Sequence, residues 1–164
     1  MAQAHEAQTV AEADDRTLVI TCLFDAPPDL VFQVWIERAH ALNWLDPGTI
    51  RSSRSTMIHD FRVGGAWRAC LKALDGSRTL WQGGVYREIK TPHRLAYSSA
   101  WDGGPETLIT VTFAAQRLKT RMIFTQTPFE TIERRESHRQ CWAGCFDRLQ
   151  ELVRAQAGAS VSLK

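Results

Sequence analysis

The hydrophobic pattern at the start of the chain predicts one strand followed by two short helices. Thr17–Phe24 is rich in β-branched and apolar residues at both parities, which is typical of a strand buried on at least one side. Pro28 and Asp29 then mark a helix start, after which apolar residues recur at intervals of three and four. A second short helix is expected over Arg38–Leu45, ending before the Asp46-Pro47-Gly48 turn.

Strands and turns dominate the middle of the chain, between Ile50 and Gln126. Asp75-Gly76 separates Trp67–Leu74 from Thr79–Ile89, which is a hairpin signal. A last hairpin is expected from Leu108–Phe113 and Met122–Thr125. Successive strands at short spacing predict an antiparallel meander of six strands. The pair Gly64-Gly65 is expected to permit a bend or bulge that curves the sheet.

The C-terminal segment, about Glu130–Ala155, shows a long helical pattern without proline. Its apolar residues recur at intervals of three and four and form one stripe: Cys141, Trp142, Cys145, Phe146, Leu149, Leu152 and Val153. An antiparallel sheet has an apolar face that must be covered, and this is the long amphipathic element available to cover it. The sequence therefore predicts an α+β fold, in which a curved antiparallel sheet of about seven strands surrounds a long C-terminal helix.

Length and composition suit one domain, since the chain has 164 residues and 44% of them are hydrophobic. We interpret residues 1–16 as a disordered leader, 17–157 as the folded domain and 158–164 as a frayed tail. The leader has neither the basic start nor the apolar stretch of a signal peptide, and no apolar run is long enough for a membrane span. A cytoplasmic location with reduced cysteines is expected. The net charge of +2 argues against a nucleic-acid binder.

A curved sheet packed on a straight helix can leave an apolar gap, which is the usual character of a small-molecule site. Six Trp residues suit the wall of such a cavity, although they suit a filled core equally well. The sequence does not distinguish an open cavity from a filled one. The candidate lining residues are Trp44, Trp67, Trp81, Tyr97, Trp101, Met122, Trp142 and Phe146.

No pattern in the sequence points to a catalytic, metal or cofactor site. Cys141 and Cys145 lie one helical turn apart, and His138 would complete a three-residue cluster. Metal sites need a further ligand or an open position, so small buried hydrophobic side chains are the favoured interpretation of both cysteines. We predict no catalytic residue, no metal and no cofactor. Three charged residues either place charge at the mouth of the cavity or form a structural ion pair: Asp60, Arg62 and Arg68.

Several short motifs follow one another between about residues 17 and 155. They are Phe24-Asp25-Ala26-Pro27 with Val31–Trp35, Trp44 at the end of the second helix, Asp60–Arg68 with its Asp-x-Arg-x-Gly-Gly turn, Gly84–Ile89 followed by Pro92, Arg94, Leu95, Tyr97 and Trp101, and Cys141-Trp142 in the last helix. In order and spacing these motifs resemble the SRPBCC (START/pollen-allergen-like) superfamily. They are most similar to its branch related to the C-terminal domain of the heat shock protein 90 ATPase activator. Cys141 departs from the pattern, because many members carry Gly there.

The resemblance implies a START-like helix-grip fold but leaves the function open, since members bind lipids, hormones or polyketides, catalyse cyclisations or assist chaperones. Our leading hypothesis is a soluble binding protein that holds a small hydrophobic molecule between the sheet and the C-terminal helix. One alternative is an interaction protein that acts on a chaperone ATPase, and another is a cyclase- or dehydratase-type enzyme using the same cavity. A homodimer is compatible with the sequence, whereas nucleic-acid and membrane partners are not expected.

Overall fold

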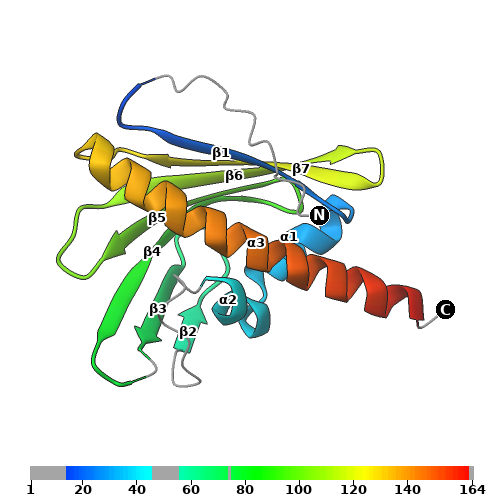
Figure 1. Ribbon diagram of the computed structural model, residues 1–164, viewed down its shortest axis with the longest axis horizontal. Helices are drawn as coiled ribbons and strands as arrows, with labels where there is room; N and C mark the ends of the chain where they lie inside the picture. The colour runs from blue at the N-terminus through cyan, green and yellow to red at the C-terminus, as the bar shows by residue number, and fades with distance from the viewer. Residues whose placement is uncertain (1–13, 46–55, 74, 163–164) are drawn as a thin grey trace.

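The computed structural model describes residues 14–45, 56–73 and 75–162. It forms one strand, two short helices, six strands and one long helix (Figure 1), which is the order predicted from the sequence. Most of the expected leader lies outside the described residues, as do the Asp46-Pro47-Gly48 turn and Ile50. The elements are β1 (Leu18–Phe24), α1 (Pro28–Ile36), α2 (Arg38–Trp44), β2 (Thr56–His59), β3 (Ala66–Lys72), β4 (Thr79–Lys90), β5 (Arg94–Trp101), β6 (Thr107–Gln116), β7 (Lys119–Thr127) and α3 (Ile132–Ser162).

The strands of the described ranges form one seven-stranded sheet in the order β1-β7-β6-β5-β4-β3-β2. Every neighbouring pair is antiparallel. Strands β2 to β7 are neighbours both in the chain and in the sheet, so the predicted meander is confirmed. Strand β1 instead pairs with β7, which brings the start of the domain beside its last strand.

The sheet is irregular in β4, where the register against β5 shifts between Tyr86 and Glu88. The loop before β3 contacts this point, since Gly64 N–H donates to the Tyr86 carbonyl over 2.8 Å and Tyr86 N–H donates to the Gly65 carbonyl over 2.9 Å. Gly64 has a φ of 84°, a conformation that favours glycine. The glycine pair thus lies in a loop, and the register shift occurs in the strand that it contacts.

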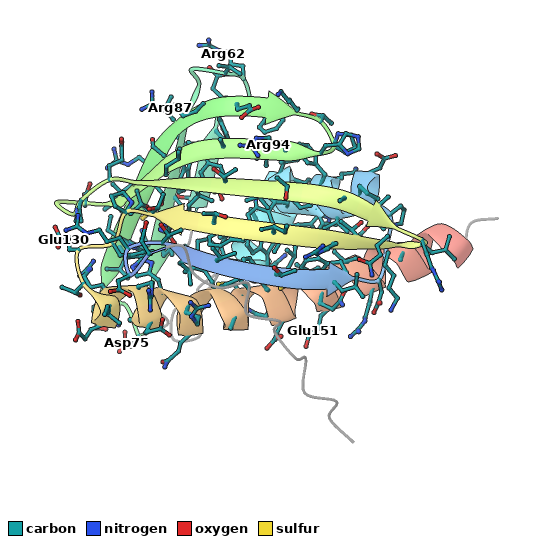
Figure 2. The ribbon with its side chains drawn as sticks, turned by 90° about the horizontal axis from the view of Figure 1, so that it is seen from above. Arg62, Asp75, Arg87, Arg94, Glu130 and Glu151 are labelled. Atoms are coloured by element: carbon teal, nitrogen blue, oxygen red, sulfur yellow. The ribbon has the colours of Figure 1, made fainter. Side chains whose placement is uncertain are left out.

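Helix α3 crosses the face of the sheet, with α1 and α2 towards one end (Figure 1). Its residues Trp142 and Phe146 pack on Phe124 of β7, with ring centroids 4.6 and 5.3 Å apart respectively. Trp35 of α1 approaches Phe146 to 5.9 Å, so one aromatic core joins both helices to the sheet. The charged side chains labelled in Figure 2 lie around the outside of this core. The predicted cover of the apolar face by the C-terminal helix is confirmed.

Helix α3 ends at Ser162, so the predicted end near Ala155 is wrong, and residues 158–162 of the expected tail are helical. The sequence after Ala155 contains alanines, no proline and a single glycine, Gly158, and alanine has the highest helix propensity. At the other end the Thr131 hydroxyl accepts the Arg134 N–H over 3.2 Å, as an N-cap does. No helix within the described residues is long and apolar enough to cross a membrane.

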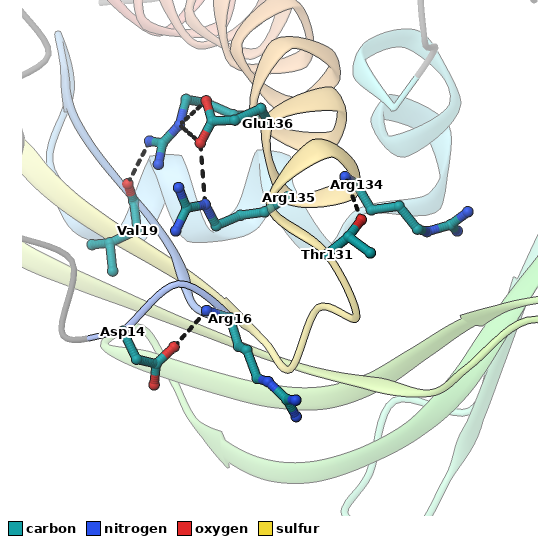
Figure 3. A network of polar contacts seen from close by, with 8 residues as sticks. Asp14, Arg16, Val19, Thr131, Arg134, Arg135 and Glu136 are labelled. Carbon is teal, nitrogen blue, oxygen red and sulfur yellow. Dashed lines mark hydrogen bonds and ion pairs between the residues drawn. The ribbon is translucent and has the colours of Figure 1, made fainter.

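The N-terminal half of α3 is tied to β1 through Arg139. Its Nη1 donates to the Val19 carbonyl over 3.1 Å, and its Nε lies 3.2 Å from Glu136 Oε2. Arg135 Nε donates to Glu136 Oε1 over 3.1 Å. Figure 3 shows the Glu136 carboxylate next to the Arg135 side chain, near strand β1. One carboxylate therefore orients two arginines, of which one holds the strand.

The C-terminal half of α3 is tied to the end of β1 through Asp25. Arg154 Nε donates to Asp25 Oδ2 over 2.8 Å, and Lys119 Nζ lies 3.0 Å from Asp25 Oδ1. Gln150 Nε2 donates to the Leu23 carbonyl over 3.1 Å. The hydrogen bonds from Lys119 and Arg154 hold the pKa of Asp25 below its usual range. The helix is thus fixed to β1 at two well-separated points.

We expect Asp25→Asn to lower the free energy of unfolding at pH 7 by about 0.5–1 kcal/mol, because two partly exposed ion pairs are lost. Since the folded-state pKa of Asp25 is lowered, this contribution is complete above the unfolded-state pKa near ~4 and is lost as the pH falls through the folded-state value. Urea unfolding at a series of pH values should show the difference shrinking in acid. Glu151→Gln, at an exposed position of α3, is the control, and a difference that did not change with pH would contradict the assignment.

We expect Gly84→Ala to lower the free energy of unfolding by more than about 2 kcal/mol. A Cβ at Gly84 would overlap the carbonyl oxygen of Ser98 on the neighbouring strand, and that backbone atom cannot move without separating β4 from β5. Gly144→Ala in α3 is the matched control, because its Cβ would meet only Arg148 Nη1 at 3.8 Å. The control should stabilise the protein by about 0.5–1 kcal/mol. Thermal unfolding measures both, and equal effects of the two substitutions would refute this explanation.

Candidate functional site

An inner cavity lies between the sheet and the three helices. Its volume is about 30 Å³, which is room for about one water molecule. Half of its twelve lining residues are aromatic: Trp35, Trp44, Trp67, Tyr86, Tyr97 and Trp142. The remaining lining residues are Ile36, Leu45, Met57, Gln82, Leu95 and Ile109.

The aromatic side chains that build this cavity also fill most of it. Trp35 and Trp44 lie with their ring centroids 4.5 Å apart. On the sheet side, Tyr97 makes edge contacts with Trp67 at 5.7 Å and with Tyr86 at 6.0 Å. The space between the sheet and α3 is therefore narrow at its inner end.

An outer groove of about 150 Å³ adjoins the inner cavity. It is lined by the end of α2, by β4 and β5, and by one face of α3: Leu45, Gln82, Trp101, Ser137, His138, Cys141, Trp142 and Cys145. Leu45, Gln82 and Trp142 line both spaces, so the groove and the inner cavity lie next to each other at these three side chains. A further cavity of about 30 Å³ shares Trp101 and His138 with the groove.

A chain of buried hydrogen bonds holds the groove wall in place. Trp142 Nε1 donates to Gln126 Oε1 over 2.8 Å, and Gln126 Nε2 donates to the Thr107 hydroxyl over 2.9 Å. Thr107 in turn donates to the Ser99 carbonyl over 3.1 Å. Gln82 Nε2 lies 3.0 Å from the Ser99 hydroxyl. These bonds connect α3 with β7, β6, β5 and β4, and they fix the orientation of the Trp142 indole.

Other polar groups that line the inner cavity are also paired, with one exception. Trp67 Nε1 donates to the Ser98 carbonyl over 3.0 Å. The Tyr86 hydroxyl lies 2.9 Å from His59 Nδ1. The indole nitrogen of Trp44 is buried and has no hydrogen-bond partner among the described residues. The wall of the inner cavity thus contains one indole N–H, that of Trp44, without an acceptor among the described residues.

The walls of the site are uncharged at neutral pH. Burial raises the pKa values of Tyr86 and Tyr97 well above their usual range, so both phenols stay protonated. Burial, reinforced by the charge of Arg134, lowers the pKa of His138 and favours its neutral form. The hydrogen bond with Cys141, followed by burial, raises the pKa of the Cys145 thiol.

The structure brings together most of the residues predicted to line a cavity. Trp44, Trp67, Tyr97 and Trp142 line the inner cavity, and Trp101 joins Trp142 in the groove. Whether these side chains contact a ligand stays a prediction.

The other three candidates lie elsewhere. Met122 and Phe146 are buried on the correct faces but belong to the filled core. Trp81 is 38% exposed, and the Arg68 guanidinium lies 4.4 Å from its ring centroid. Gln82, its neighbour in β4, faces the cavity instead, as expected for a strand in which adjacent side chains point to opposite faces.

Sequence reasoning missed eight residues that line the inner cavity: Trp35, Ile36, Leu45, Met57, Gln82, Tyr86, Leu95 and Ile109. The alternation of side chains between the two faces of a strand could have identified three of them. Tyr86 and Gln82 are four residues apart in β4, and Leu95 shares its parity with Tyr97 in β5. Alternation gives no such signal for Trp35, because its position depends on how helix α1 packs against the sheet.

The charged residues near the Gly64 loop form exposed ion pairs. Arg62 Nε lies 2.6 Å from Asp60 Oδ2, and Arg68 Nη2 lies 3.9 Å from Asp102 Oδ1. None of these four residues lines the three cavities described above. In the part of the chain that the structure describes, no group of three or more His, Cys, Asp or Glu residues is arranged to hold a metal ion.

Residues 25–154 match the model of the protein family described as Activator of Hsp90 ATPase homolog 1-like protein. The chain belongs to this family. This match confirms the resemblance to the SRPBCC superfamily and to its heat shock protein 90 activator branch. No match was found among curated proteins.

Solved structures of low sequence identity share the fold of this family member. Protein CV1439 from Chromobacterium violaceum is 22% identical with a TM-score of 0.72, and the match covers 83% of this chain and 96% of that one. A protein from Rhodobacter sphaeroides is 21% identical with a TM-score of 0.74, covering 87% and 94%. DynU16, from the dynemicin biosynthetic locus, is 15% identical with a TM-score of 0.69, covering 86% of this chain and 48% of that one.

We expect Gln126→Met to lower the free energy of unfolding by about 1–3 kcal/mol, because the Trp142 N–H would be buried without an acceptor. Methionine keeps the length and volume of the glutamine side chain, so the loss reports on the hydrogen bonds. Gln140→Met, at an exposed position of α3, is the control and should change stability by less than about 0.5 kcal/mol. Urea unfolding measures both, and equal stability of the two variants would show that the buried hydrogen bonds contribute nothing.

Proposed function

We propose that the protein binds a small, neutral, apolar molecule of about one ring, with the ring in the outer groove. The observation that carries this proposal is the groove itself, which has a volume of about 150 Å³ and adjoins the inner cavity. Trp101 and Trp142 line it with large apolar surfaces. Aromatic faces and edges of this kind pack favourably against a planar ring.

The volume limits the size of the ligand. A cavity of about 150 Å³ is large enough for benzene, whereas sites for drug-sized molecules have volumes of about 300–1,000 Å³. The inner cavity adds about 30 Å³, which suits a short substituent rather than a second ring. We infer a ligand smaller than a sterol or a two-chain lipid.

The chemistry of the walls favours a neutral ligand. No Asp, Glu, Lys, Arg or His is present among the described residues that line the inner cavity. In the groove, the lowered pKa of His138 favours an uncharged imidazole. An ionised ligand would lose its hydration without gaining a charged partner. This loss costs on the order of several kcal/mol. Membership of a family with a helix-grip fold supports this binding function.

Ligand-detected NMR with a panel of neutral single-ring compounds tests the proposal. We expect dissociation constants between about 10 µM and 1 mM, because ligands with few atoms gain limited binding energy. Ser137→Trp should weaken binding at least about tenfold, since Ser137 lines the groove and a new indole would occupy it. Gln140→Trp, at an exposed position of the same helix that does not line the groove, is the matched control.

Absence of binding across the panel, or binding that Ser137→Trp leaves unchanged, would contradict the proposal. Mass spectrometry of the recovered compound separates two functions, because a carrier returns the ligand unaltered and a cyclase- or dehydratase-type enzyme does not. Stimulation of a chaperone ATPase that persists in Ser137→Trp would favour the interaction-protein alternative instead.

A further inference from the structure

We propose that the ligand carries a neutral hydrogen-bond acceptor, such as a carbonyl oxygen, which receives the indole N–H of Trp44. This inference rests on the proposed function and specifies the class of ligand. Its ring would lie in the outer groove and its acceptor would reach into the inner cavity. A small aryl ketone, ester or amide has this combination of groups.

The first support is the hydrogen-bond status of Trp44. The residue is 1% exposed, and its Nε1 has no partner among the described residues. Two other indoles that line the same cavity, Trp67 and Trp142, donate to protein oxygens over 3.0 and 2.8 Å. Buried donors are nearly always paired in folded proteins. An acceptor from outside the protein, either a ligand oxygen or a water molecule that a ligand would displace, would therefore satisfy this donor.

The second support is the position of Trp44 in the wall of the inner cavity. Trp44 ends helix α2 and borders the inner cavity, and the next residue, Leu45, lines both the cavity and the groove. The inner cavity of about 30 Å³ has room for a group the size of a carbonyl. A ligand with its ring in the groove would place its substituent past Leu45, Gln82 and Trp142 to reach the space that Trp44 borders.

No acceptor among the described residues lies within hydrogen-bond distance of Trp44 Nε1. The ring nearest to Trp44 is Trp35, tilted by 47° at a centroid distance of 4.5 Å, and an aromatic face accepts a hydrogen bond only weakly. The Tyr86 hydroxyl is already engaged with His59. Because no described lining residue of the cavity carries a positive charge, the acceptor that fits is neutral rather than a carboxylate.

Two probes of the same shape test this inference on the unmodified protein. Acetophenone carries a carbonyl oxygen, whereas α-methylstyrene has a CH₂ group in its place. We expect acetophenone to bind about threefold to tenfold more tightly, which is the effect of one net hydrogen bond. In ¹H–¹⁵N NMR spectra the Trp44 Nε1–H signal should move downfield with acetophenone and not with α-methylstyrene.

Trp44→Phe assigns that signal and should remove the preference for acetophenone, leaving the two probes with equal affinity. Trp67→Phe is the matched control, because its N–H is already bound to Ser98. It should affect both probes alike and keep the preference. If both probes bind the unmodified protein equally and the Trp44 signal does not respond to the carbonyl, the inference is overturned while the proposed function stands. If neither probe binds, the proposed function and this inference are overturned together.

Discussion

The packing of Trp142 and Phe146 on Phe124 holds helix α3 against the sheet, and the rest of the structure depends on this contact. A single sheet has one apolar face to bury, and in this fold α3 covers it together with α1 and α2. Because the Trp142 indole also donates to Gln126, the helix is fixed in rotation as well as in position. The face of α3 that carries Ser137 and Cys141 is therefore turned towards the groove.

The same aromatic residues that stabilise the fold determine how much space it leaves. Large rings bury much apolar surface and contribute strongly to stability, but they also occupy the hollow between a curved sheet and a straight helix. Here the inner end is reduced to the volume of about one small group, while the groove at the side keeps about five times that volume, 150 against 30 Å³. Stability and capacity for a ligand are thus in direct competition at this site.

The fold was predictable because its signals are local and repeated. Turn dipeptides separate the strands, the apolar stripe defines α3, and the ordered motifs identify the family. The end of α3 was not predictable in the same way, because an alanine-rich segment without proline carries no stop signal before Ser162. The pairing of β1 with β7 joins segments that lie far apart in the sequence, and local patterns do not encode such a pairing.

The site was only partly predictable, for physical reasons that individual residues illustrate. Residue type alone selected Trp81, yet the alternation of β4 places it outside and Gln82 inside. Met122 and Phe146 show that an inward-facing apolar residue need not border a cavity, since neighbouring rings cover both. The pairing state of the Trp44 indole depends on which oxygens surround it in three dimensions, so no sequence pattern could have revealed it.

The contact between Trp35 and Trp44 also has an optical consequence. Two indoles whose centroids lie 4.5 Å apart at an angle of 47° are close enough for their electronic transitions to couple. Their absorption then belongs to the pair, and the skewed arrangement makes that pair chiral. The circular dichroism of the strong far-ultraviolet indole bands accordingly contains a contribution that depends on how α1 sits against α2. Ordinary fluorescence, by contrast, reports an average over several neighbouring indoles that exchange excitation energy.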